Sequence, residues 1–403
     1  QYSPSLAAGL EFSLPLRGEQ TSLRGELFTR ADREDRSRTH SDVRELFYEA
    51  LDERFEFRIG ARRVFWGVAE SRHLVDILNQ SDFVEDLEAE HKLGQPMLSL
   101  KLIRDVGALE FFLMPYQRAR TYPGPNGHPH LPFPVAAEEA RYESQLAQSH
   151  LDWATRWQQS FSGLDYGLSV FNGTAREPRI LPCLRRGSGF RGTEERANCD
   201  IASGIETPTS PLPEELTPIL QALGLAPSDE AARAEITRQV LANLVLVPAY
   251  DRLRQISLDA QYVWDQLAFK LEALRRESRG VYSTATVAGV EWSLGDPFGF
   301  GWDLSLLTEH LSDSAANAAR YDDDWFAATR IGFNDAAGSQ ILAGAVADHS
   351  GNDRFYQIEA SRRLGDDWKL SGKFRAFGKI PADSPTLFLD QEDLFSLTLE
   401  RFW

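Results

Sequence analysis

Apolar and polar residues alternate along most of this chain. The last stretch is the clearest case, because Phe395, Leu397 and Leu399 alternate with polar residues from Ser396 to Glu400. Successive side chains of a strand point to opposite faces, so this pattern predicts strands with one apolar and one polar face. The same period predicts sixteen strands, over 20–30, 42–50, 53–63, 96–104, 107–117, 148–158, 161–172, 252–264, 266–277, 281–293, 299–310, 324–334, 339–348, 353–363, 367–378 and 392–403.

The polar face of these strands is strongly charged. In 53–63, charged residues occupy one face and apolar residues the other; the charged set is Arg54, Glu56, Arg58 and Arg62. Charge on every second residue is typical of a strand whose polar face meets a water-filled interior. The pattern therefore predicts an all-β, transmembrane antiparallel β-barrel of about 16 strands, within a range of 14 to 18.

The connections fall into two classes. Tight turns are expected near positions 52, 105, 162, 265, 296, 336 and 365, and long polar connections over 31–41, 65–95, 118–147, 173–250, 311–323 and 379–391. The two classes alternate, which is typical of barrels with short periplasmic turns and long extracellular loops. We expect 20–403 to form the barrel and 1–19 to be a periplasmic segment or an extra strand, since residues 5–14 also alternate.

Composition narrows the class of protein. The 403 residues contain no apolar run of about 18 residues, which excludes membrane-spanning helices, whereas a barrel strand needs only about 10 residues with half of them polar. A net charge of -17 argues against a nucleic-acid partner, because phosphate binding requires a basic surface. Gln1 in place of Met favours a mature chain whose signal peptide was removed or omitted.

The closing strand resembles that of Gram-negative outer-membrane β-barrels, whose last residue is commonly Phe or Trp. Here the chain ends on Phe402 and Trp403, although Arg401 stands where that class usually has an aromatic residue. The resemblance implies the cell outer membrane, contact with its lipid and lipopolysaccharide, and insertion by the barrel-assembly machinery through this strand. We expect it to close the barrel through Phe395, Leu397, Leu399 and Trp403. A soluble β-sandwich is the alternative.

The stretch from Arg58 to Asp86, with residues 92–97, resembles a group of proteobacterial porin-like barrels of uncharacterised function. In the loop 65–95, Leu74, Ile77 and Leu78 have helical spacing, which predicts a short amphipathic helix. We expect this loop to fold into the lumen and narrow it; a helix over the rim is the alternative.

The loop 173–250 contains both cysteines. In an oxidising compartment Cys183 and Cys199 are expected to form one disulfide. Helices are expected to start near Pro211–Leu216 and at Ser228, so the loop is interpreted as a lid, a plug, a docking surface or a cap that stiffens the rim.

The expected lumenal charges have mixed signs. Mixed signs favour salt bridges between neighbouring strands, while the basic rows alone favour anionic solutes. The candidate lumen and constriction residues are Arg54, Arg58, Arg62, His73, Asp76, Lys101, Lys369, Lys373 and Arg375.

No motif for a cofactor, metal or catalytic centre is present. His128 and His130 have no third ligand nearby in sequence, and Ser71, His73 and Asp76 are too close together to form a triad. We therefore expect no cofactor, no metal and no enzymatic activity. The favoured function is a porin-like channel for small or polymeric solutes, passive or loop-gated. The alternatives are a docking barrel that binds a periplasmic or extracellular protein and an outer-membrane lipid hydrolase.

Overall fold

The computed structural model describes residues 3–16, 18, 20–86, 90–185, 197, 199, 243–315, 323–348, 354–378, 380, 389 and 392–403. In this part of the chain, seventeen strands form one antiparallel sheet. They are β1 (Ser5–Pro15), β2 (Thr21–Asp32), β3 (His40–Leu51), β4 (Phe55–Arg62), β5 (Gln95–Arg104), β6 (Gly107–Met114), β8 (Asp152–Phe161), β9 (Leu164–Thr174), β12 (Arg252–Trp264), β13 (Leu267–Ser278), β14 (Val281–Gly295), β15 (Asp303–Asp313), β16 (Asp323–Gly332), β17 (Gln340–Asp348), β18 (Arg354–Leu364), β19 (Trp368–Phe377) and β20 (Leu394–Arg401).

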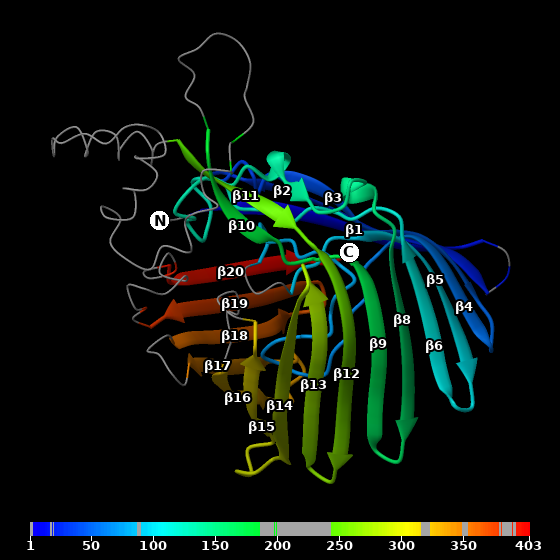
Figure 1. Ribbon diagram of the computed structural model, residues 1–403. Coiled ribbons are helices and arrows are strands. Elements are labelled where there is room, and N and C mark those ends of the chain that lie inside the picture. The colour runs from blue at the N-terminus through cyan, green and yellow to red at the C-terminus, as the bar shows by residue number, and fades with distance from the viewer. Residues whose placement is uncertain are drawn as a thin grey trace.

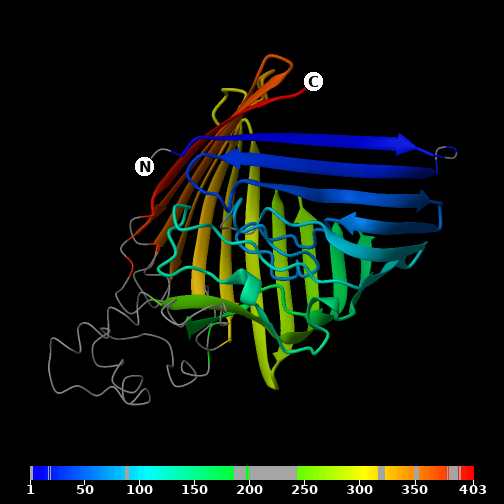
Figure 2. The ribbon, with the colours of Figure 1, turned by 90° about the horizontal axis from the view of Figure 1, so that it is seen from above.

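Each strand pairs with its neighbours in chain order, and the sheet curls around a central space (Figures 1 and 2). The edge strands are β1 and β20, and no backbone pairing joins them in the described residues. The count of seventeen lies within the predicted range of 14 to 18, so the predicted antiparallel β-barrel is confirmed. The segment 1–19 contains β1, which pairs along its whole length with β2.

Tight turns lie at one end of the barrel. Ser162 and Gly163 connect β8 to β9 with φ angles of 48° and 83°, a left-handed conformation that a two-residue hairpin needs. The long connections lie at the opposite end, where residues 63–94 join β4 to β5 and residues 115–151 join β6 to β8. The alternation of short and long connections follows the pattern expected from the sequence except between β13 and β14, which the two-residue turn Arg279–Gly280 joins at the end with the long connections.

The outer face of the barrel is apolar. On β14, Tyr282 and Trp292 point outward and are exposed, while Ala285 and Val287 point inward and are buried. Ten residues separate the two aromatic side chains, which corresponds to about 25 Å across a membrane for a strand that rises about 3.3 Å per residue and tilts by about 40°. Two aromatic levels at this spacing match the apolar band of an outer-membrane barrel.

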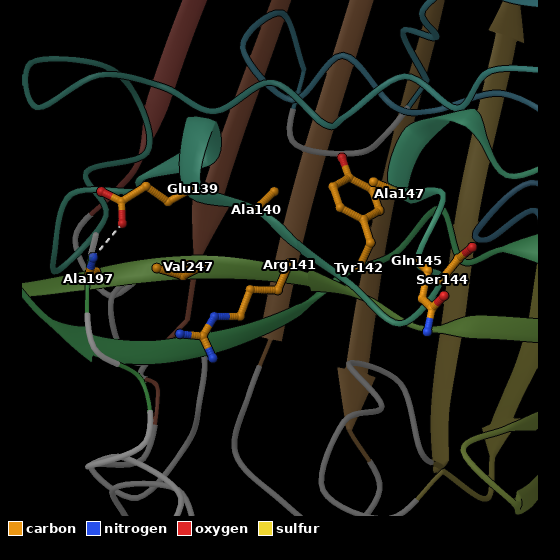
Figure 3. A pocket seen from close by; sticks show the side chains of 9 residues that line it. All are labelled: Glu139, Ala140, Arg141, Tyr142, Ser144, Gln145, Ala147, Ala197 and Val247. Atoms are coloured by element: carbon orange, nitrogen blue, oxygen red, sulfur yellow. Dashed lines mark hydrogen bonds between the residues drawn. The ribbon is translucent and has the colours of Figure 1, made fainter. Parts of the chain in front are cut away.

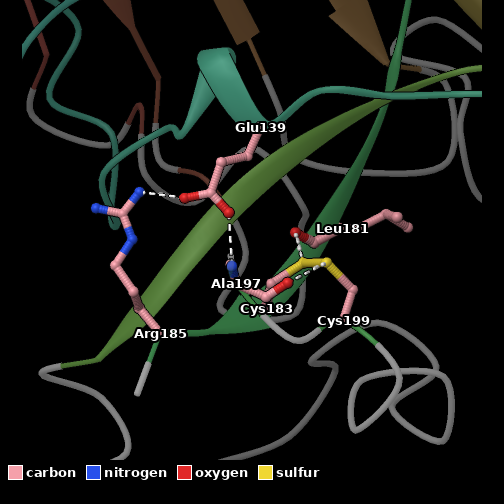
Figure 4. The surroundings of a disulfide bond; sticks show 6 residues. All are labelled: Glu139, Leu181, Cys183, Arg185, Ala197 and Cys199. Carbon is pink, nitrogen blue, oxygen red and sulfur yellow. Dashed lines mark hydrogen bonds and ion pairs between the residues drawn. A yellow bond between two sulfur atoms is a disulfide. The ribbon is translucent and has the colours of Figure 1, made fainter. Parts of the chain in front are cut away.

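A second, smaller sheet lies at the end with the long connections. It contains β7 (Arg141–Tyr142), β10 (Arg179–Leu184) and β11 (Leu244–Tyr250), so the loop 173–250 carries two strands that the sequence did not predict. Cys183 on β10 is bonded to Cys199, which gives the expected disulfide (Figure 4). We call this sheet, with η1 (Ala137–Glu139) and η2 (Ala147–Ser149), the cap.

The prediction of short helices in the loops is wrong for the described residues, where η1 and η2 are single 3-10 turns. The helices expected near 211–216 and 228 lie outside the described residues. No helix in the described part of the chain combines the length and the apolar composition needed to cross a bilayer.

Candidate lumenal site

The connection between β4 and β5, residues 63–94, lies inside the curve of the sheet, and we call it the lumen loop (Figure 2). Trp66, Val75 and Leu78 of this loop are buried against inward-facing side chains of β5, β6, β8, β9 and β12. Those wall residues are Met97, Phe112, Met114, Ala154, Phe171 and Leu253. Because apolar burial stabilises the docked loop, this loop fills part of the lumen as a packed element.

The helix expected in this loop does not form. The backbone N–H groups of Val68 and Ala69 donate to Glu272 Oε1 at 2.7 and 2.9 Å, and the N–H of Val75 donates to Glu272 Oε2 at 3.2 Å. Glu309 accepts from the N–H groups of the next two residues, Glu70 and Ser71. Carboxylates of the wall thus bind backbone N–H groups between residues 68 and 75 and hold this segment in an irregular conformation.

The far end of the loop reaches other parts of the wall. Glu85 accepts from Arg30 of β2 at 2.8 Å, and Asp86 forms a buried ion pair with Arg375 of β19. Nearer the start of the loop, Glu70 pairs with Arg330 of β16 at 2.6 Å. The loop is therefore held by β2, β13, β15, β16 and β19, so it spans the lumen.

Three predicted lumen residues lie in a ladder of alternating charge across β3 to β6. Arg58 lies 3.2 Å from Glu49 and 2.6 Å from Glu56. Lys101 lies opposite Glu56 in the register, and Arg62 donates to Ser99 and lies 4.0 Å from Glu110. The mixed signs are thus paired along the wall. Arg54, by contrast, is exposed in the turn between β3 and β4.

The predicted residues of β19 are placed differently from one another. Lys373 pairs with Glu359 of β18 at 2.7 Å and lies 3.7 Å from Glu90 of the lumen loop. Arg375 is engaged by the loop through Asp86, as described above. Lys369 lies opposite Glu400 in the register with β20, nearer the end with the tight turns.

His73 and Asp76 lie within the lumen loop. Burial lowers the pKa of His73, whose ring packs edge-on against Phe65 with centroids 4.7 Å apart. Burial also raises the pKa of Asp76, which pairs with Lys92 of the same loop at 3.2 Å. Both side chains therefore contact other residues of the lumen loop.

The lumen loop covers one side of the wall more completely than the other. On β8 and β12, Arg156 and Asp259 form a double hydrogen bond at 2.6 and 2.7 Å, and the guanidinium also lies over the ring of Trp66. The Arg156 side chain is 10% exposed, whereas Arg330 on β16 is 40% exposed and Glu359 on β18 is 35% exposed. Solvent therefore reaches the lumenal charges of β16 to β18 and is excluded from those of β8 and β12.

The sequence placed Glu272 among the lumen-facing charges but did not predict that Glu272 and Glu309 hold the loop. Both are fully buried; Glu272 lies between Leu271 and Ala273, whereas Glu309 lies between the polar residues Thr308 and His310. In the register, Glu272 lies opposite Asp259 and Val287, so no basic residue of the neighbouring strands pairs with it. An inward-facing carboxylate of this kind is the signal that could have indicated a partner outside the barrel wall.

The cap contains a second candidate site, a cavity of about 540 Å³. Figure 3 shows Glu139, Arg141, Tyr142, Gln145 and Val247 along its wall. The Glu139 carboxylate accepts from the N–H of Ala197, next to the disulfide, and pairs with Arg185 at 2.5 Å (Figures 3 and 4). The cavity therefore lies within the part of the cap that the disulfide braces.

A barrel with an apolar exterior, a charged lumen and long loops at one end is an outer-membrane architecture. The chain has the fold of an outer-membrane β-barrel.

No family model matches the chain, and no curated protein matches it. Similar solved structures include Wzi of Escherichia coli, described as a carbohydrate-binding β-barrel involved in group 1 capsule assembly, with 8% identity over 92% of this chain and 74% of that chain and a TM-score of 0.48. Others are OccK7 (OpdD) of Pseudomonas aeruginosa, with 11% identity over 100% and 94% of the two chains and a TM-score of 0.46, and a Rh. blastica porin mutant, with 10% identity over 99% and 90% and a TM-score of 0.39. At such identities, the function has to be argued from the residues of this chain.

Proposed function

We propose that the protein is an outer-membrane channel for small polar solutes, whose path is restricted by the lumen loop. The observation that carries the proposal is the unequal exposure of the wall charges. Those of β8 and β12 are sealed by the loop, and those of β16 to β18 remain in contact with solvent. Kinship with the proteobacterial porin-like group is part of the same proposal and rests on the stretch from Arg58 to Asp86.

The path runs between the lumen loop and strands β16 to β19. Arg330 and Lys373 supply its positive charge, and Glu70, Glu90 and Glu359 supply negative charge from the loop and the wall. Because charges of both signs line it, the path passes small ions of either sign and discriminates between them weakly. The apolar packing of the loop on the opposite wall makes the restriction a stable one.

Reversal potentials in planar bilayers under a salt gradient test this path. Neutralising the two basic residues, by Arg330→Gln with Lys373→Gln, is expected to shift the selectivity toward cations because the glutamates then dominate the local field. Arg254→Gln is the matched control, since Arg254 is exposed on the outer face of β12 and should leave the reversal potential unchanged.

Three results would contradict the proposal. The first is a folded protein that conducts no ions, and the second is a double variant with the reversal potential of the parent. The proposal also assigns the barrel no catalytic step, so ester hydrolysis by the folded protein in detergent would count against it.

A docking role is the second candidate, and the braced cap favours it. The cavity of about 540 Å³ combines a carboxylate, a guanidinium and a tyrosine side chain in a disulfide-bonded unit. A partner held by this cavity is expected to co-purify with the parent and to be lost when Arg141 and Tyr142 are both replaced by Ala.

A further inference from the structure

Two connections at the end of the barrel with the long connections meet at two histidines and one glutamate. His128 and His130 belong to the connection between β6 and β7, and Glu392 lies two residues before the start of β20. The Nδ1 atoms lie 3.3 Å (His128) and 2.9 Å (His130) from the two carboxylate oxygens of Glu392. The three side chains each offer a ligand atom, and all these atoms lie within 4.8 Å of one another.

From this geometry we infer a zinc site formed by His128, His130 and Glu392. Two imidazoles and one carboxylate are a common donor set for a zinc ion with one open position. Bonds of about 2.0–2.1 Å in tetrahedral geometry place neighbouring ligand atoms about 3.3 Å apart, close to the two histidine–carboxylate distances of 3.3 and 2.9 Å. The sequence could not indicate this site, because the third ligand lies more than 260 residues from the histidines.

The protein holds these ligands in place before a metal binds. The turn that precedes His128 is anchored by Asp35, a buried residue of the connection between β2 and β3, whose carboxylate accepts from the N–H of Gly124 at 3.1 and 3.2 Å. Asn126 donates to the carbonyl of Glu34. A fixed backbone reduces the entropy lost when the two imidazoles converge on an ion.

Glu392 is fixed from its other side. Its N–H donates to the carbonyl of Leu389 at 3.0 Å, and the carboxylate of the next residue, Asp393, accepts from the N–H of Phe377 at the end of β19. A zinc ion here joins the β6–β7 connection to the start of β20, an edge strand of the sheet. Water is the fourth ligand of the zinc ion. By joining the β6–β7 connection to the residues just before β20, the ion restrains the edge strand β20.

The test uses the tag-free, full-length protein, stripped with a chelator and refolded in detergent. Zinc alone is titrated by calorimetry, and bound zinc is counted by elemental analysis after desalting. The expected result is about one zinc ion per chain for the parent and at least tenfold weaker binding for His130→Ala and for Glu392→Gln. His310→Ala is the matched control, since His310 pairs with a single carboxylate, Asp323 at 2.8 Å, and its loss should not change binding.

A second readout tests the clamp itself. Zinc is expected to raise the temperature at which the parent loses its compact form on unheated gels and to leave that of Glu392→Gln unchanged, because only the intact site joins the loop to β20. Compact migration of each variant without zinc shows that it has folded. Absence of stoichiometric zinc binding by the folded parent, or unchanged binding by the folded variants, would overturn the inference.

Discussion

At the residue scale, the central feature is the use of buried carboxylates to hold backbone N–H groups. Glu272 accepts from three N–H groups of the lumen loop, and Glu309 accepts from two. A buried donor that loses its acceptor costs on the order of 1–3 kcal/mol. Two glutamates thus fix a loop that has no regular secondary structure.

Glu272→Gln tests this role. The amide replaces one acceptor oxygen with a donor that faces other donors, so we expect residues 68–75 to exchange backbone hydrogen at least tenfold faster than in the parent. Glu56→Gln is the matched control, because Glu56 pairs with Arg58 and Lys101 within the wall. Equal exchange in the parent and in Glu272→Gln would contradict the role.

The buried histidines of the lumen loop predict a pH dependence. Burial lowers the pKa of both His73 and His91 in the docked loop, so a released loop binds protons more readily. Docking is therefore most stable above the ordinary histidine pKa of about 6.5 and weakens as the pH falls below it. Asp76 acts in the opposite sense. Because its pKa is raised in the docked loop, the docked loop takes up this proton at a higher pH than the released loop does, so protonation of Asp76 favours docking as the pH falls.

Hydrogen exchange of the loop at pH 7.5 and 5.5 measures this effect. Exchange corrected for its intrinsic rate is expected to be faster at pH 5.5, and the difference is expected to shrink in the variant with His73→Gln and His91→Gln. The charged groups that face His73 are Glu70, Asp76, Lys92 and Glu309. If exchange in that variant accelerates in acid as much as in the parent, the effect belongs to groups other than the two histidines.

At the element scale, the wall could be predicted from the sequence and the lumen loop only in part. Strict alternation predicted sixteen strands of the barrel, because the alternation of apolar and polar residues depends on the two faces of each strand and not on its particular contacts. The spacing of Leu74, Ile77 and Leu78 predicted a helix that does not form, since their burial is set by the wall and not by a helical face. Contacts such as the Asp86–Arg375 pair join residues 289 positions apart, beyond the reach of local pattern.

The cap is a separate element whose sheet is braced by one disulfide. Cys183 and Cys199 are 16 positions apart, so their bond removes loop entropy worth about 3 kcal/mol from the unfolded cap. Replacing both with Ser is expected to expose residues 179–184 to proteolysis while the barrel keeps its compact migration on unheated gels. Loss of the compact form together with the cap would show that the two do not fold independently.

At the scale of the whole molecule, the barrel is apolar outside and charged inside. On the outward face of β14, Ala288 lies between the aromatic levels of Tyr282 and Trp292, and Thr284 lies close to one of them. Arginine at the middle of a bilayer costs about 2–4 kcal/mol, and near the interface about 0–1. We therefore expect Ala288→Arg to lower the equilibrium constant for folding in lipid vesicles by at least thirtyfold, and Thr284→Arg to lower it by less than tenfold. Equal effects would contradict the assigned membrane position.

The central claim is that the lumen loop restricts a channel through the barrel. Arg62 and Gln95 are register partners, so the residues left after deletion of 68–92 can still connect β4 to β5. The decisive measurement is single-channel conductance of the parent and of this deletion, each shown to be folded by heat-modifiable migration. We predict a small, steady conductance for the parent and a severalfold larger one for the deletion. Equal conductance in the two proteins, or none in the folded deletion, would contradict the account.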